Sequence, residues 1–150
     1  MAIARIQKMD PTHLDKVLVI ENASSLTPWS KEMFLEELRN PLAHAVVHGG
    51  DDARGLLVDG FLCFRNVGDE SELLNLGVDP LYRRRGIARE LMQFYVAFAQ
   101  EKQIKTFFLE VHVSNLPAIQ LYRGFSYQPA GMRKRFYKGQ FDALVMVRSA

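Results

Sequence analysis

The sequence predicts an α+β (mixed α/β) fold, a single domain over residues 1–150 with a mixed, mostly antiparallel central sheet flanked by helices. Two observations carry this prediction. Short runs rich in β-branched and aromatic residues alternate with segments of helical periodicity, and no repeat or linker interrupts them. The second half reads strand, helix, strand, helix, strand, which favours one central βαβ unit. With 150 residues, 48% of them hydrophobic, the chain is large enough to bury one continuous core.

Two helices are expected near the N-terminus. In "DPTHLDKVLVIENASS", Asp10 is the expected N-cap and Pro11 occupies the first helical position. The residues that follow at helical spacing are Leu14, Val17, Leu18 and Glu21. In "TPWSKEMFLEELRNP", Ser30 is the expected N-cap, and the helix should end before Pro41.

Strands and helices then alternate along the rest of the chain. The runs "AHAVVH", "GLLVDGFLCFRNV" and "SELLNLGV" are separated by turn-forming segments, which predicts successive antiparallel strands. A helix from about Gly86 to Gln103 should follow, then the strand "KTFFLEVHV". Asn115 is expected to cap a further helix, "LPAIQLYR", with Pro117 tolerated in its first turn, and "FDALVMVR" should form the last strand.

Composition argues against several classes of protein. The net charge of +2 is too small for general nucleic-acid binding, which needs a broad basic face. Cys63 is the only cysteine, so it forms no intramolecular disulfide, and its apolar strand predicts an inert core residue. His44, His48 and His112 lack the spacing of metal ligands, so no metal site is expected.

No apolar run approaches the roughly 20 residues that span a bilayer, and the start "MAIARIQKMD" lacks the apolar region of a signal peptide. We expect a cytoplasmic protein that binds neither membrane nor nucleic acid directly.

The segment from Val78 to Met92, "VDPLYRRRGIARELM", indicates an anion site. Where a strand gives way to a helix, the first helical N–H groups have no partner within the helix and, with the helix dipole, attract an anion such as a pyrophosphate. Gly86 would let the anion approach the backbone, and Ala88 keeps the next contact small. Positive charge is supplied by Arg83, Arg84, Arg85 and Arg89. From this stretch alone, a solvated basic helix start remains the alternative.

In this context, "RRRGIA" resembles the Q/R-x-x-G-x-G/A coenzyme-binding motif of the GNAT acetyltransferases, because it follows a strand and opens a helix. The resemblance covers most of the chain and narrows to the RimI-type ribosomal-protein alanine N-acetyltransferases. "TPWSKEMF" is similar to their PWS element, "LEVHVSNLPAIQLY" to their LEVxxSNxxAIxLY signature, and "RKRFY" and "DALVM" to their C-terminal segments.

Two departures from that family pattern are visible. Phe125, Ser126 and Tyr127 stand where the family has Leu-Gly-Phe, and the loop between Tyr137 and Asp142 is short. We expect both to fall near the acceptor side, where they bear on the identity of the substrate more than on coenzyme binding.

The resemblance implies a GNAT fold, acetyl-coenzyme A as cosubstrate, and acetyl transfer to the N-terminal α-amine of an alanine in a ribosomal protein. The coenzyme would lie where two parallel strands splay apart, with its pantetheine arm against one strand and its pyrophosphate at the helix start. The residues so implied in coenzyme binding are Leu76, Gly77, Val78, Arg83, Arg84, Arg85, Gly86, Ile87, Ala88, Arg89 and Asn115.

Glu110 and Tyr122 occupy the positions of the family's general base and general acid. By strand alternation Glu110 shares a face with Phe108 and His112, and apolar surroundings would make such a carboxylate a stronger base. A phenol with a pKa of about 10 can protonate a thiolate whose conjugate acid has a pKa of about 8.5 at modest cost. The alternatives are an exposed carboxylate on a half-solvated strand and a core tyrosine that closes its helix.

Three functions therefore stay open at this point. The first is N-terminal acetylation of a ribosomal protein, with Glu110 and Tyr122 as catalytic residues. The second is a GNAT enzyme that acts on a lysine or a small amine. The third, which retention of both residues disfavours, is a non-catalytic module that binds coenzyme or ribosome.

Overall fold

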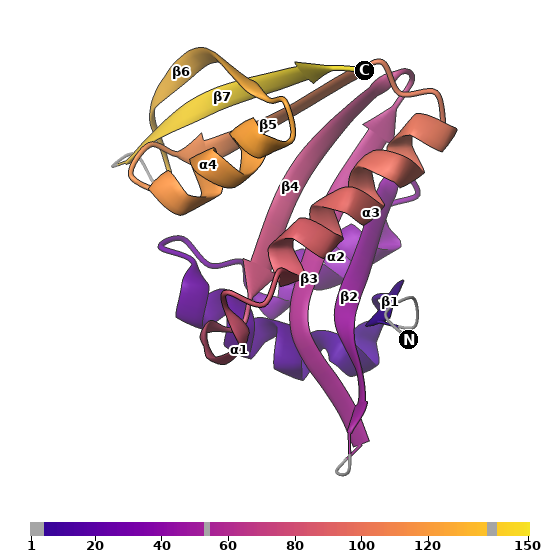
Figure 1. Ribbon diagram of the computed structural model, residues 1–150. Helices are drawn as coiled ribbons and strands as arrows, with labels where there is room; N and C mark the ends of the chain where they lie inside the picture. The colour runs from indigo at the N-terminus through magenta and orange to yellow at the C-terminus, as the bar shows by residue number, and fades with distance from the viewer. Residues whose placement is uncertain (1–4, 53–54, 138–140) are drawn as a thin grey trace.

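The computed structural model describes residues 5–52, 55–137 and 141–150. In these ranges seven strands form one sheet in the order β1-β2-β3-β4-β5-β7-β6 (Figure 1). Neighbouring strands are antiparallel, except that β4 and β5 are parallel and are joined through helix α3. This confirms the predicted mixed sheet and its central βαβ unit. The strands are β1 (Ile6–Lys8), β2 (Ala43–Asp52), β3 (Gly55–Val67), β4 (Glu70–Val78), β5 (Thr106–His112), β6 (Gln128–Tyr137) and β7 (Phe141–Ser149).

The helices are α1 (Leu14–Ser24), α2 (Lys31–Arg39), α3 (Ile87–Glu101) and α4 (Leu116–Gly124). Their N-terminal caps confirm the predictions. Ser30 Oγ accepts a hydrogen bond from the Met33 N–H at 3.2 Å, and Asn115 Oδ1 accepts one from the Ala118 N–H at 3.3 Å. Asp10 caps a single 3-10 turn, Pro11–His13, that leads into α1.

Two strands were not predicted. β1 has three residues, too few to show an alternating pattern. β6 contains the basic segment "RKRFY". It lies at the edge of the sheet, and its residues 128–134 are all exposed. A strand without a buried face shows no alternation of polar and apolar residues, so the sequence pattern could not reveal it.

The core has two parts, one on each face of the sheet. Helices α1 and α2 cover one face, and α3 and α4 cover the other (Figure 1). α3 approaches β3 closely at Gly60, where a Cβ atom would lie 2.9 Å from Ile87 Cγ2 and 3.2 Å from Leu91 Cδ1. The absence of a side chain at Gly60 therefore seats the first turn of α3 directly on the sheet.

Three expectations from composition can be compared with this fold. Cys63 is fully buried, and burial raises the pKa of its thiol, which confirms an inert core residue. Among the described residues, no group of three or more His, Cys, Asp and Glu side chains could hold a metal ion. No helix in the described ranges is both long enough and apolar enough to span a bilayer.

Candidate active site

A wedge opens between β4 and β5. The two strands pair from Glu70 to Leu73 and from Thr106 to Leu109, and beyond these residues no pairing joins them. The cause lies in β4, where the register with β3 shifts so that Leu74 has no partner on β3. Such a bulge bends its strand and increases the local twist. The last residues of β4, 76–78, therefore pair with β3 while their other edge faces the wedge, as predicted for two splayed parallel strands.

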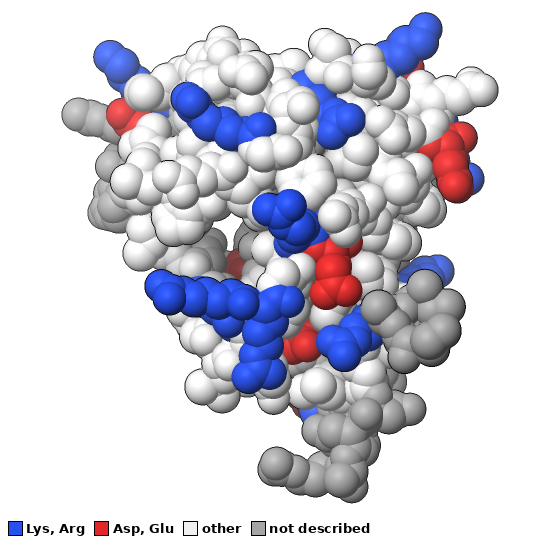
Figure 2. Space-filling view, in the orientation of Figure 1, with Lys and Arg blue, Asp and Glu red and all other residues white. Residues whose placement is uncertain are grey.

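A cavity of about 750 Å³ fills this wedge. In Figure 2 the surface is hollowed between α4 and the β4–α3 loop (residues 79–86), and basic side chains lie along the edge of the hollow. Segments distant in sequence meet there: the end of α1, the loop before α2, β4, the β4–α3 loop, β5 and α4. Eight of the predicted site residues line the cavity: Leu76, Gly77, Val78, Arg83, Arg84, Glu110, Asn115 and Tyr122.

Glu110 enters the cavity from β5. It lies on the face opposite the buried Leu109 and Val111, as alternation predicted, and its side chain is 14% exposed. Its surroundings are less apolar than expected, because Arg133 of β6 reaches across β7 and donates from Nη1 to Glu110 Oε1 at 2.6 Å. The guanidinium thus holds one carboxylate oxygen of Glu110 at the wall of the cavity.

Tyr122 enters the same cavity from α4. Only 7% of its surface is exposed, and its ring packs against Tyr127 with the centroids 5.9 Å apart. Asn115, which caps α4, lines the cavity too. A carboxylate and a phenol thus approach one space from two elements, with a strand edge as the third wall.

The β4–α3 loop adopts an unusual backbone conformation. Arg84 and Gly86 both have positive φ angles, 65° and 78°, and such angles cost a non-glycine residue free energy. A Cβ atom on Gly86 would find nothing within 4 Å, so the space beside this backbone is open to a ligand. A strained loop that exposes backbone at a helix start suits an anion such as a pyrophosphate.

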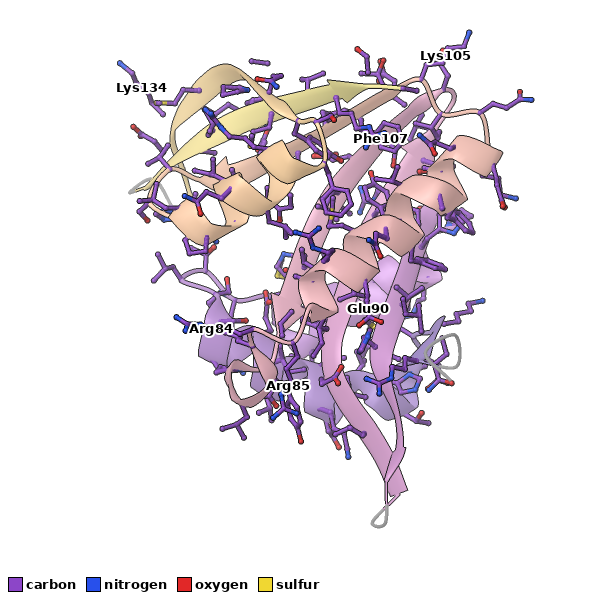
Figure 3. All side chains as sticks on the ribbon, viewed as in Figure 1. Arg84, Arg85, Glu90, Lys105, Phe107 and Lys134 are labelled. Atoms are coloured by element: carbon purple, nitrogen blue, oxygen red, sulfur yellow. The ribbon has the colours of Figure 1, made fainter. Side chains whose placement is uncertain are left out.

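Side chains around this loop differ in what they can do. Arg84 and Arg85 project from it in different directions (Figure 3), and the Arg85 guanidinium lies 5.2 Å from the centre of the Tyr82 ring. Ile87 is buried against β3, so only its backbone is available to a ligand. The predicted residues that do not line the cavity are Arg85, Gly86, Ile87, Ala88 and Arg89, which lie further along the loop and into α3.

Glu21 is a cavity residue that the sequence analysis did not assign to the site. Its side chain is almost completely buried, and Oε2 accepts hydrogen bonds from the Trp29 N–H at 2.9 Å and from Asn75 Nδ2 at 3.0 Å. Burial raises the pKa of Glu21, although both hydrogen bonds oppose that effect. One carboxylate oxygen therefore joins the segment before α2 to the bulged part of β4, two walls of the cavity. In the sequence, this role was indicated only by a carboxylate at a core-facing position of an apolar helix.

Residues 125–127, where the sequence departs from the family pattern, do not line the cavity. Tyr127 is fully buried in the core beneath α3 and α4. Ser126 has a φ of 70°, which explains why a glycine suits this position in the family pattern. This departure therefore changes the packing at the end of α4. The centre of the short loop between Tyr137 and Asp142 lies outside the described residues.

Comparisons with known proteins agree with this geometry. The model of the acetyltransferase (GNAT) family matches residues 14–127. The chain is 30% identical over 145 residues, 94% of each chain, to the ribosomal protein bS18-alanine N-acetyltransferase of Escherichia coli (strain K12). It is 37% identical over 146 residues, covering 95% of this chain and 93% of the other, to a Bacillus subtilis (strain 168) protein to which the same activity is provisionally assigned.

A solved structure gives the same result for the fold. The crystal structure of the Escherichia coli ribosomal-protein-S18-alanine N-acetyltransferase superposes with a TM-score of 0.83 at 27% identity, covering 96% of this chain and 92% of the other. The chain therefore belongs to the GNAT acetyltransferase family, as its sequence motifs predicted, and is an acetyl-coenzyme A-dependent N-acetyltransferase.

Proposed function

We propose that this enzyme acetylates the N-terminal α-amine of a ribosomal protein, with alanine as the terminal residue and bS18 as the protein. The observation that carries the proposal is the meeting of Glu110 and Tyr122 in one cavity that the free edge of β4 also lines. The acceptor is proposed because the two relatives named above share almost the whole length of the chain and are named for this substrate.

Acetyl-coenzyme A fits this site by its chemistry. The unpaired edge of β4 at Leu76, Gly77 and Val78 offers backbone groups to the amides of the pantetheine arm. The open backbone at Gly86 and the amides from Arg84 to Arg89 suit the pyrophosphate, with arginine side chains nearby to balance its charge. When bound there, the coenzyme supplies the thioester carbonyl that the acceptor amine attacks.

Glu110 and Tyr122 would move the two protons of the reaction. Glu110 accepts a proton from the acceptor ammonium, so that the neutral nitrogen can form the new N–C bond. As the C–S bond breaks, Tyr122 donates its phenolic proton to the departing thiolate. The new amide nitrogen loses its second proton to the phenolate, and Glu110 releases the proton it accepted to solvent. Arg133 holds the Glu110 carboxylate in place before the acceptor arrives.

The acceptor class follows from proton affinity. An α-amine has a pKa of about 7.7–8.0 and a lysine side chain one of about 10.4. Near pH 7.5, roughly one third of α-amines but only roughly one in a thousand lysines are neutral. A single carboxylate that already bears an arginine partner is therefore better matched to an N-terminus than to a lysine.

The test measures thiol release from acetyl-coenzyme A with three peptides. One begins with the free N-terminal alanine of bS18, the second is the same peptide with a blocked N-terminus, and the third is blocked but carries a free lysine. We expect turnover with the first peptide alone. Turnover with the lysine peptide alone, or with none of the three, would refute N-terminal acetylation and direct attention to lysines or to small amines.

A further inference from the structure

A buried charged triad lies outside the cavity, behind the β4–α3 loop. His48 of β2 is completely buried, and its Nδ1 lies 2.6 Å from Asp59 Oδ1 of β3, while its Nε2 lies 3.2 Å from Glu90 Oε2 of α3. Asp59 is nearly as buried as the histidine, whereas the Glu90 side chain is 35% exposed. Glu90 lies in the first turn of α3, over β2 and β3 (Figure 3). The steps described above for acyl transfer use none of these three side chains.

A β-bulge brings the triad together. His48 pairs with Gly60 and Gly49 pairs with Val58, so Asp59 is an extra residue without a partner on β2. Without this insertion, alternation would point Asp59 away from the face that His48 occupies. Gly49 permits the bulge, because its φ is 147° and a Cβ atom there would lie 2.0 Å from the Leu57 carbonyl oxygen.

The same bulge holds both ends of the segment proposed to bind the coenzyme phosphates. At the beginning of the β4–α3 loop, the Asp79 N–H donates to the backbone carbonyl of Asp59 at 2.8 Å. At the other end, the Asp59 carboxylate holds His48, and His48 holds Glu90. One residue of β3 therefore fixes the strained loop that contains Arg84 and Gly86 from both sides.

We infer that Asp59, His48 and Glu90 act as positioning residues for coenzyme binding, and that the protonation of His48 sets the affinity for the coenzyme phosphates. The inference rests on the proposed binding of the pyrophosphate to the β4–α3 loop. The imidazolium has two N–H donors, one for each carboxylate. A neutral imidazole has only one N–H donor, and its other nitrogen then presents a lone pair to a carboxylate. Asp59 is the closer and more buried partner, so it keeps the N–H of the neutral ring. Glu90 and the first turn of α3 then lose the hydrogen bond that anchors them.

The direction of the pH effect follows from the charges around His48. Burial disfavours the imidazolium, but the hydrogen bond and charge of Asp59, with the charge of Glu90, outweigh it and raise the pKa of His48. Among the described residues, Asp59 and Glu90 are the charged groups that act on this ring. The anchor is therefore complete at low pH and is lost as the pH rises through the raised pKa, so coenzyme affinity should fall over that range. By reciprocity, coenzyme binding should raise the pKa of His48 further.

The experiment compares His48→Gln and Glu90→Ala with wild type. Glu101→Ala is the matched control, because it removes the same side chain from an exposed position at the other end of α3. Calorimetry gives the affinity for coenzyme A from about pH 6 to about pH 9, a range that brackets histidine titration. A second readout is kcat/KM with acetyl-coenzyme A and with acetyl-pantetheine, which has no phosphate. We expect both triad variants to bind coenzyme A about tenfold more weakly at low pH, with a flatter pH dependence. Acetyl-pantetheine turnover and the control should stay unchanged.

The outcomes distinguish this inference from the proposed site. Arg84→Ala tests the phosphate site itself, and it should weaken coenzyme A while leaving acetyl-pantetheine turnover unaffected. If Arg84→Ala has that effect while Glu90→Ala, with an unchanged melting temperature, binds coenzyme A as wild type does at every pH, the role of the triad is refuted and the site stands. If Arg84→Ala also has no effect on coenzyme A, the phosphate site is misplaced and the role of the triad falls with it. If the triad variants lower kcat/KM equally with acetyl-coenzyme A and with acetyl-pantetheine, the triad has only a structural role, and the inference is refuted too.

Discussion

Replacement of Glu110 by glutamine tests the proposed base directly. Glutamine keeps the shape of the side chain, and its amide oxygen can still accept the hydrogen bond from Arg133, but it cannot take a proton from an ammonium. A general base contributes about 10²- to 10⁴-fold to turnover, equivalent to about 3–5 kcal/mol of activation free energy. We expect kcat to fall by that factor.

The structure also predicts what this substitution should leave intact. Arg133 is 57% exposed, so the ion pair with Glu110 should contribute no more than about 1 kcal/mol to the free energy of unfolding. A loss of that size lowers the melting temperature of a chain of this length by about 2–4 °C. Coenzyme A affinity, measured by calorimetry, should be nearly unchanged, because the carboxylate is proposed to act on the acceptor.

Glu72→Gln is the matched control for this experiment. Glu72 lies on β4 opposite Phe108, on the same face as Glu110, and burial together with the nearby Glu110 raises the pKa of its carboxyl group. It does not line the cavity, so its replacement should leave kcat within about threefold of wild type, well below the loss from a missing general base. Near-normal kcat in Glu110→Gln, or equal losses in the two variants, would refute the reasoning.

Three further substitutions test other parts of the site and fold. Tyr122→Phe should lower kcat by about 10²-fold with a nearly constant KM, because it removes only the proposed acid; an unchanged kcat would contradict that role. Gly77→Ala would place a Cβ atom 2.5 Å from Phe61 Cε2 in the core, and thermal unfolding should show a loss of about 1–3 kcal/mol. Wild-type stability of Gly77→Ala would contradict this prediction, because it would mean that the Phe61 ring moves aside freely. Ser126→Gly relieves a φ of 70° and should raise the free energy of unfolding by up to about 1 kcal/mol, whereas Ser25→Gly, at a φ of −111°, should lower it. A loss of stability in Ser126→Gly would contradict the strain argument.

Local signals explain why most of the fold was predictable from sequence. The caps at Ser30 and Asn115 are short-range hydrogen bonds between residues three apart, so their chemistry is complete within a few letters of sequence. The face of Glu110 follows from the period of a strand whose opposite face is buried. The Arg83–Ala88 motif and the βαβ order together located the wedge, because a strand, loop and helix in that order define where a parallel pair can splay.

Contacts over long distances in sequence could not be predicted in the same way. Arg133 and Glu110 are 23 residues apart, and Glu21 and Asn75 are 54 apart. Nothing local in "RKRFY" indicates that one of its arginines meets the carboxylate of another strand. Glu21 gave a partial signal, since burial of a carboxylate is costly unless hydrogen-bond donors meet it, but the sequence does not reveal those donors.

Two interruptions of regular strand pairing produce the site. At Leu74 the bulge in β4 turns the strand away from β5 and opens the wedge. At Asp59 the bulge in β3 turns a carboxylate toward His48 and presents a carbonyl to Asp79. The two bulges lie on the adjacent strands β4 and β3. A regular ladder in β3 would put Asp59 on the wrong face, and one in β4 would keep the strand paired with β5. Alternation of polar and apolar residues describes the regular ladder, so it predicts the sheet but not the two departures from it on which the site depends.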